Sequence, residues 1–235
     1  MKQIVIATGF VLAFTLTTFG QTQSRDDILK EISVKRAELS KLEKAFLAPS
    51  EEDQARYKDF LHQSNTGLIR LLPRETFDTG NSKLNLRGGG SFYSFKDLTH
   101  EYINSTDLSL EQGEFSTGFA GANYGLLVRL GDVPLEDVNL EMGAAHVMAE
   151  YTPAADEPKA RIEQRKWSEG TAIDGVTYKR RVPVQLNNTY VLRSINYHAS
   201  DTLVAFRVVR VDNDDSVVIL WKLLKKYPTP YLARN

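Results

Sequence analysis

Long runs rich in apolar residues, separated by short polar turns, occupy the last part of the chain. This pattern predicts three consecutive β-strands, at Thr189–Tyr197, Thr202–Asp212 and Val217–Lys225. The runs are rich in Val, Ile, Leu and aromatic residues, and Asn, Asp and Ser cluster between them, which is typical of an antiparallel meander. The middle run is apolar at both parities from Leu203 to Val209. Because successive side chains of a strand point to opposite faces, we expect this strand to be central and covered on both sides.

The N-terminal part of the chain has helical spacing instead. Residues Arg25–Leu47 follow a capping-box pattern at Ser24 and carry an apolar face that Lys35 interrupts. This face consists of Ile28, Ile32, Leu39, Leu42 and Phe46. A second capping box at Ser50 starts a shorter helix that ends near Asn65. The helical pair has two interpretations. It either packs on the domain that follows, or it mediates self-association or forms a stalk. The first helix has about three heptads, which is short for an independent coiled coil.

From Gly67 onward the pattern changes to short segments of strand character. They lie at 68–72, 83–87, 91–95, 107–112, 114–119 and 124–130. Asp174-Gly175 is a hairpin signal between two three-residue strands. The stretch from Pro134 to Tyr151 has no clear period, and 161–167 fits a strand or a short helix. Many short strands without helical periodicity predict a sandwich or a partly closed barrel.

These patterns together predict an α+β protein, in which an N-terminal helical pair precedes an antiparallel β-sandwich or partly open barrel. We divide the 235 residues into a signal segment at 1–20, a helical segment at 21–66 and a β domain at 67–235. The composition, 42% hydrophobic and 25% charged, is that of a globular protein.

The first 20 residues have the form of a secretory signal peptide. Lys2 supplies a positive charge, Ile4–Phe19 an apolar stretch, and Thr18-Phe19-Gly20 small residues near a cleavage position. The stretch is short for a bilayer span, which needs about 20 apolar residues. We therefore expect a secreted or periplasmic protein. The alternative is that the segment is not cleaved. It then serves as an N-terminal anchor and is the only part of the protein that contacts the membrane.

Charge and residue usage exclude several classes of function. The chain has no cysteine, so disulfides, thiolate catalysis and zinc–thiolate sites are ruled out. A net charge of −1 argues against general nucleic-acid binding. The stretch Asp212–Ser216 begins like a calcium loop but lacks the required Gly and Glu further on, so we interpret it as a hairpin turn. The histidines are scattered, at His62, His100, His146 and His198. We predict no metal site and no cofactor.

Acidic and basic residues are unevenly distributed. Between Asp97 and Glu157 about a dozen acidic residues face one basic residue, Arg129, and from Lys159 to Arg193 the balance reverses. Opposite charges in consecutive blocks either hold two parts of one sheet system together or present a bipolar surface to a partner.

Motifs for catalysis are absent or incomplete. The nearest approach to a serine nucleophile elbow, Gly113–Gly118, is one residue too long and alternates like a strand. The glycines at 118–125 match neither a dinucleotide fingerprint nor a Walker sequence. Glycoside hydrolysis needs only two suitably placed carboxylates, so it remains an alternative. The available acids are Glu101, Glu111, Glu114, Glu136, Asp137 and Glu141.

An aromatic stretch near residue 95 is the most site-like group in the sequence. The predicted ligand-binding residues are Tyr93, Phe95, His100, Glu101 and Tyr102. An exposed aromatic face of a β-sandwich would bind a peptide or a carbohydrate, whereas core packing is the alternative for the same rings.

The resulting prediction is a secreted or envelope-located, non-enzymatic binding or structural module. We expect a peptide or carbohydrate ligand, no nucleic acid, and self-association through Arg25–Gln63 as an option. A secreted glycosidase-like hydrolase that uses paired carboxylates is the alternative.

Overall fold

The computed structural model describes residues 24–78 and 83–233. The predicted signal peptide at 1–20 lies outside these residues and stays a prediction. The chain divides into two compact units, one ending at Ser40 and one beginning at Lys41. Residues 25–40 of the first unit belong to helix α1 (Arg25–Leu47), and the strands of the described residues all lie in the second unit.

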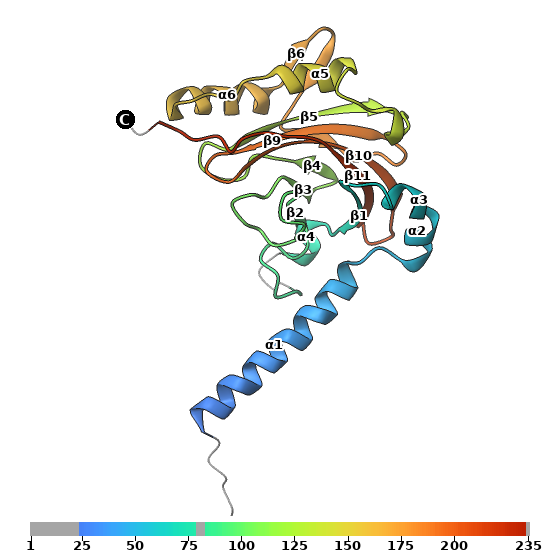
Figure 1. Ribbon diagram of the computed structural model, residues 1–235, viewed down its shortest axis with the longest axis vertical. Helices are drawn as coiled ribbons and strands as arrows, with labels where there is room; N and C mark the ends of the chain where they lie inside the picture. The colour runs from blue at the N-terminus through green and yellow to red at the C-terminus, as the bar shows by residue number, and fades with distance from the viewer. Residues whose placement is uncertain (1–23, 79–82, 234–235) are drawn as a thin grey trace, which may run out of the picture. The chain divides into compact units, whose positions relative to one another are not determined.

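A five-stranded antiparallel sheet forms the centre of the second unit, in the order β1-β11-β10-β9-β5 (Figure 1). Its strands are β1 (Thr66–Leu71), β5 (Tyr124–Gly131), β9 (Thr189–Asn196), β10 (Ser200–Val211) and β11 (Val217–Lys226). The pairs β9–β10 and β10–β11 are both antiparallel. The predicted meander is therefore confirmed, and its middle strand lies between the other two.

A four-stranded antiparallel sheet packs on one face of the five-stranded sheet. It has the order β2-β3-β4-β8 and consists of β2 (Phe92–Tyr93), β3 (Leu108–Glu111), β4 (Glu114–Ser116) and β8 (Arg181–Pro183). The ring of Phe115 lies 5.0 Å from that of Phe206 on β10 and 5.2 Å from that of Tyr190 on β9. The two sheets share one buried cluster of apolar side chains. The predicted α+β fold with an antiparallel sandwich is thus confirmed, and the sheets do not close into a barrel.

Helices cover the opposite face of the five-stranded sheet (Figure 1). They are α5 (Gly143–Glu150) and α6 (Glu157–Glu169), which bury Met148 and Trp167 against this face. On β10, Ala205 belongs to the cluster under the helices, whereas Phe206 belongs to the cluster between the sheets. Both parities of β10 are therefore buried, which is why its sequence is apolar throughout.

The N-terminal helices begin at the predicted caps. Helix α1 has the predicted bounds, and Ser24 Oγ accepts a hydrogen bond from the Asp27 N–H at 3.1 Å. Ser50 caps the second helical segment in the same way. That segment consists of α2 (Glu51–Arg56) and α3 (Lys58–Leu61), which are separated at Tyr57. Within the described ranges, no helix combines the length and the apolar character that a membrane span requires.

The short connecting elements agree with the predictions in part. The hairpin of β6 (Thr171–Ile173) and β7 (Val176–Tyr178) forms at the predicted turn. Helix α4 (Arg74–Phe77) and the 3-10 helix η1 (Leu135–Asp137) were not predicted. Residues 161–167 are helical, because the Asp156 carboxylate caps the Lys159 N–H and a proline stands in the first turn of α6.

The strand predicted at 83–87 is wrong. These residues form turns and bends. Leu84 and Leu86 pack against a small cluster of Leu47, Leu72 and Phe77, while the residues between them are exposed. An irregular segment that buries every second residue has the same sequence period as a strand.

Candidate functional site

The predicted aromatic site is divided by the structure between the core and a pocket. Tyr93 and Phe95 are buried in the cluster between the two sheets. Their rings lie 5.2 Å apart, and the Phe95 ring lies 5.2 Å from that of Trp221. Core packing, the alternative in the sequence, therefore describes these two residues.

His100 joins the same aromatic group from the loop after β2. Its ring lies 5.0 Å from that of Tyr93, and its Nε2 lies 2.8 Å from the carbonyl oxygen of Arg70. A carbonyl only accepts hydrogen bonds, so Nε2 carries the proton. Burial lowers the pKa of His100 to about 4, which keeps the ring neutral at physiological pH. This histidine ties its loop to β1.

Glu101 and Tyr102 lie outside that core. The Glu101 carboxylate accepts a hydrogen bond from the backbone N–H of Arg87 at 3.2 Å. The Arg87 guanidinium lies over the Tyr102 ring, 4.8 Å from its centroid. Tyr102 and Arg87 both line a cavity of about 430 Å³. One predicted residue therefore lines the cavity, and a second holds the backbone at its edge.

We call this cavity the arginine pocket. It lies at the four-stranded sheet, and strands β2, β3 and β8 supply Phe92, Glu111 and Arg181. The full lining is Arg74, Asp78, Arg87, Gly88, Phe92, Tyr102, Glu111, Phe119, Arg180 and Arg181. Its size falls in the range of about 300–1,000 Å³ that is common for small-molecule sites.

Three aromatic rings form one wall of the arginine pocket. The Phe92 ring lies 4.7 Å from that of Tyr102 and 5.2 Å from that of Phe119, and the latter contact is edge-to-face. Gly88 borders this wall with a φ of +92°, and a Cβ there would lie 2.4 Å from Cδ2 of Phe92. Only glycine combines this backbone conformation with such a close ring. The glycine therefore allows Phe92 to support the wall.

Two arginines of the pocket are paired with carboxylates. Arg74 contacts Glu111 at 3.1 Å and Asp78 at 3.3 Å. Arg181 contacts the other oxygen of Glu111 at 2.7 Å. The Arg181–Glu111 pair joins the acidic block of the sequence to the basic block, in agreement with the first of the two charge interpretations. Glu111 is therefore held between two guanidinium groups.

The other two arginines have no acidic partner among the described residues. The Arg180 side chain donates one hydrogen bond, from Nε to the carbonyl oxygen of Thr117 at 2.9 Å, and its two terminal nitrogens have no partner within residues 24–78 and 83–233. The Arg87 guanidinium has only its contact with the Tyr102 ring there. Burial, and then the charge of Arg181, lower the pKa of Arg180, whereas the nearby Glu111 carboxylate, with which Arg180 forms no ion pair in the described chain, acts in the opposite direction. Four guanidinium groups face two carboxylates in this lining, so the pocket has an excess of two positive charges.

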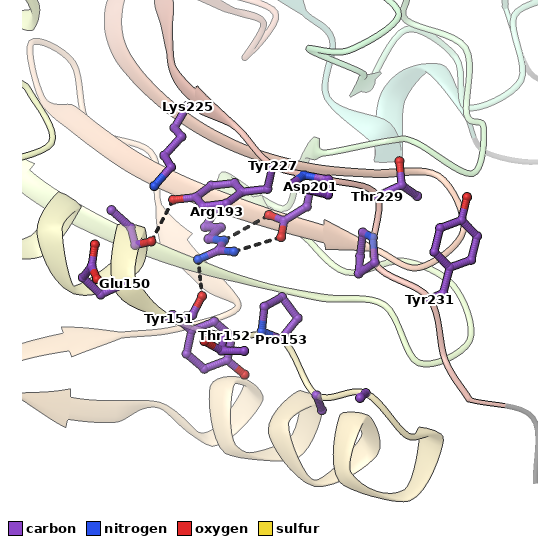
Figure 2. Close-up of a pocket in the computed structure, with 15 residues that line it drawn as sticks. Glu150, Tyr151, Thr152, Pro153, Arg193, Asp201, Lys225, Tyr227, Thr229 and Tyr231 are labelled. Carbon is purple, nitrogen blue, oxygen red and sulfur yellow. Dashed lines mark hydrogen bonds and ion pairs between the residues drawn. The ribbon is translucent and has the colours of Figure 1, made fainter.

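A second cavity, of about 440 Å³, lies beside Arg193 (Figure 2). Arg193 makes a bidentate contact with Asp201, at 3.0 and 2.9 Å, and both residues are 2% exposed or less. Its third nitrogen donates to the carbonyl oxygens of Met148 and Tyr151 at the end of α5. The Tyr227 ring covers the guanidinium at 3.8 Å. We call this group the Arg193 centre, and each of the three guanidinium nitrogens of its arginine has at least one acceptor.

The acidic turn after β10 is engaged in ion pairs. Arg70 contacts Asp212 at 3.3 Å and Asp214 at 3.2 Å, which supports the hairpin interpretation of this stretch. Within residues 24–78 and 83–233, no group of three or more His, Asp or Glu side chains is arranged to hold a metal ion. Of the six acids considered for glycoside hydrolysis, only Glu111 lines the arginine pocket.

The arginine pocket was not predicted from the sequence, because its arginines stand far apart in the chain. The adjacent pair Arg180-Arg181 in the basic block and the glycines at 88–90 were the only local signals. Comparisons with protein-family models, with curated proteins and with solved structures give no match.

Proposed function

We propose that this protein is a non-enzymatic binding module and that the arginine pocket holds its ligand. The observation that carries this proposal is a pair of guanidinium groups, on Arg87 and Arg180, that face a cavity without an acidic partner in the described chain. Arg180 is half-buried, so its charge without an ion pair is costly, and a bound anion would remove that cost. The aromatic wall beside these groups offers an apolar contact surface as well.

The proposed location is outside the cytoplasm, secreted or periplasmic. Its support is the charged start and apolar stretch at 1–20, followed by small residues. If this segment is not cleaved, it anchors the module in the membrane. We propose no cofactor. We also propose no nucleic-acid partner, because the net charge of the chain is close to zero.

We further propose that α1 pairs with α1 of a second copy of this chain. Its apolar side chains recur at alternating intervals of four and three residues from Ile28 to Phe46, with Lys35 as the one polar member. We call this row the α1 seam, and its apolar members are 38–68% exposed. In a parallel pair Glu31 lies near Arg36 of the other copy, whereas an antiparallel pair would bring Glu31 near Glu38. A parallel pair also brings Glu38 near Glu43 of the other copy, so these charges do not fix the orientation of the dimer.

One experiment on the mature chain distinguishes ligand binding from hydrolysis of the ligand. An array of defined oligosaccharides and peptides is probed with the wild type and with the Arg87→Gln/Arg180→Gln variant, and the soluble probes are then analysed by mass spectrometry. We expect probes that the wild type retains intact and the variant does not. Equal retention by both proteins would contradict the proposed site. Cleaved sugars that disappear with Glu111→Gln would favour the hydrolase alternative.

A further inference from the structure

We infer that the arginine pocket recognises an acidic carbohydrate, in which one anionic group of a sugar binds Arg87 and Arg180. This inference rests on the proposed function, because it names the ligand class of the same site. Three kinds of groups line the pocket, and each one restricts the chemistry of the ligand: unpaired guanidinium groups, partly engaged carboxylates and aromatic rings.

The unpaired guanidinium groups require an anionic group on the ligand. Arginine stays charged at all physiological pH values and presents its N–H groups as a planar fork that fits an oxyanion. The fork of Arg180 is held in place by its hydrogen bond to Thr117, which leaves both terminal nitrogens available in the described chain. Arg87 is oriented by the ring of Tyr102. A carboxylate or a sulfate group satisfies such donors.

The two carboxylates in the lining restrict the rest of the ligand. Each oxygen of Glu111 accepts from one arginine, and one oxygen of Asp78 accepts from Arg74. A carboxylate offers about four acceptor sites, so acceptor capacity remains on both groups. Further acceptors attract hydroxyl donors. The ligand is therefore expected to combine an anionic group at Arg87 and Arg180 with several hydroxyl groups.

The aromatic wall supplies a surface for an apolar face of the ligand. Tyr102 and Phe119 are half-buried, and Phe92 behind them is buried. A pyranose ring has one face of C–H groups and a rim of hydroxyl groups, which matches rings beside carboxylates. An extended peptide is a poorer match, because it is recognised through main-chain pairing with a strand edge. Strand β2, the edge strand that supplies Phe92, is only two residues long.

Calorimetry with a defined probe tests this inference. The mature wild-type chain is titrated with galacturonic acid trimer, with its methyl ester and with a sulfated neutral trisaccharide. We expect the acid to bind and esterification to weaken binding at least about tenfold, because the charge-assisted hydrogen bonds are lost. Arg180→Gln and Arg87→Gln are each expected to weaken binding of the acid about tenfold or more.

Arg56→Gln is the matched control. Arg56 lies over the ring of Tyr57, 5.7 Å from its centroid, as Arg87 lies over Tyr102, but it is outside the pocket. We expect this variant to bind the acid like the wild type. Circular dichroism of each variant verifies that the fold is retained.

The outcomes separate this inference from the proposed function. Arginine-dependent binding of the sulfated probe but not the carboxylate would still support an acidic sugar and would identify sulfate as the group. Binding of the ester or of a peptide with the same arginine dependence would overturn the inference and leave the binding module in place. If the acid bound equally to wild type and Arg87→Gln/Arg180→Gln, the site itself would be refuted. Absence of binding by every sugar probe would overturn the inference.

Discussion

The Arg193 centre and the arginine pocket contain the same residue types in opposite states. Each combines arginine, carboxylate and aromatic side chains beside a cavity of about 430–440 Å³. At the Arg193 centre the guanidinium contacts one carboxylate, two carbonyl oxygens and two tyrosine rings. In the arginine pocket, Arg87 and Arg180 have neither a carboxylate nor a full set of acceptors in the described chain.

The difference distinguishes an arginine that is paired within the protein from one that makes no ion pair in the described chain. Arg193 and Asp201 are almost completely buried, and a buried charge must be paired within the protein itself. Arg180 is half-buried and Arg87 is exposed, so solvent reaches both groups and partly screens their charges. The two sites have similar arginine content and cavity volume, so these properties do not separate them. They differ in how many guanidinium N–H groups have an acceptor.

The largest expected effect comes from breaking the buried pair. Arg193→Met leaves the Asp201 carboxylate buried without a partner, and we expect it to lower the free energy of unfolding by about 3–5 kcal/mol. Arg180→Gln is expected to lower it by less than about 1 kcal/mol, because that side chain has no ion pair to lose. Urea denaturation measures both. Equal losses for the two variants would remove the distinction between the two sites.

Asp107 extends the comparison to a buried carboxyl group that has hydrogen-bond donors but no cationic partner in the described chain. Its carboxylate accepts from the Phe95 N–H at 2.8 Å, from Asn196 at 3.1 Å and from Thr202 at 3.2 Å. Burial raises the pKa of Asp107 to about 7, against 3.8 for the free residue. Between these values the folded state holds a proton that the unfolded state has lost, so stability falls as the pH rises.

The pH dependence is expected to reach up to about 4 kcal/mol for this one group. Its contribution is fully present below about pH 4 and is lost as the pH rises through about 7. Asp107→Asn cannot ionise, so we expect its free energy of unfolding to change less over this interval than that of the wild type. Denaturation at a series of pH values measures the difference. Parallel curves for the two proteins would show that Asp107 is ionised throughout.

A smaller loss of stability is expected from a substitution at Gly88, whose backbone conformation supports the wall of the arginine pocket. Gly88→Ala places a Cβ against the Phe92 ring at a positive φ, and we expect a loss of about 1–3 kcal/mol. Gly113→Ala is the matched control, since Gly113 also has a positive φ but no atom within 4 Å of an added Cβ. The difference between the two variants isolates the contact with Phe92. If the control lost as much stability, the ring contact would have no role.

The smallest effect on stability is expected from the α1 seam. Leu39→Glu places a charge on the seam of a helix whose side chains are exposed, so the β domain should unfold as in the wild type. Its effect should lie in association, with a shift from dimer to monomer in sedimentation equilibrium. Ser33→Glu, on the outer side of α1, is the control and should remain dimeric. A monomeric wild type would exclude the proposed pairing.

The predictable parts of the fold were those with a strong local period. The apolar runs of β9–β11, the Asp174-Gly175 turn and the caps of α1 and α2 each depend on neighbouring residues, and the structure confirms them. Residues 83–87 show the limit of such reasoning, because irregular chain can bury every second residue. The aromatic stretch shows another limit, since the period of a two-residue strand does not tell which face is covered.

The arginine pocket could not be found in this way. Its members come from residues 74 to 181, and their proximity depends on the pairing of β2, β3, β4 and β8. The basic block indicated that Arg180 and Arg181 lie in a charged region, but it did not indicate that Arg181 is paired and Arg180 is not. That distinction appears only once the tertiary contacts are known.

The central claim is that Arg180 waits for an anion while Arg193 is already satisfied. Its most direct test is the thermal unfolding midpoint of the wild type and of Arg180→Gln, each measured with and without galacturonic acid trimer. Because a ligand that binds only the folded state raises its stability, the account predicts a higher midpoint for the wild type and little change for the variant. An equal rise in both proteins, or none in the wild type, would contradict it.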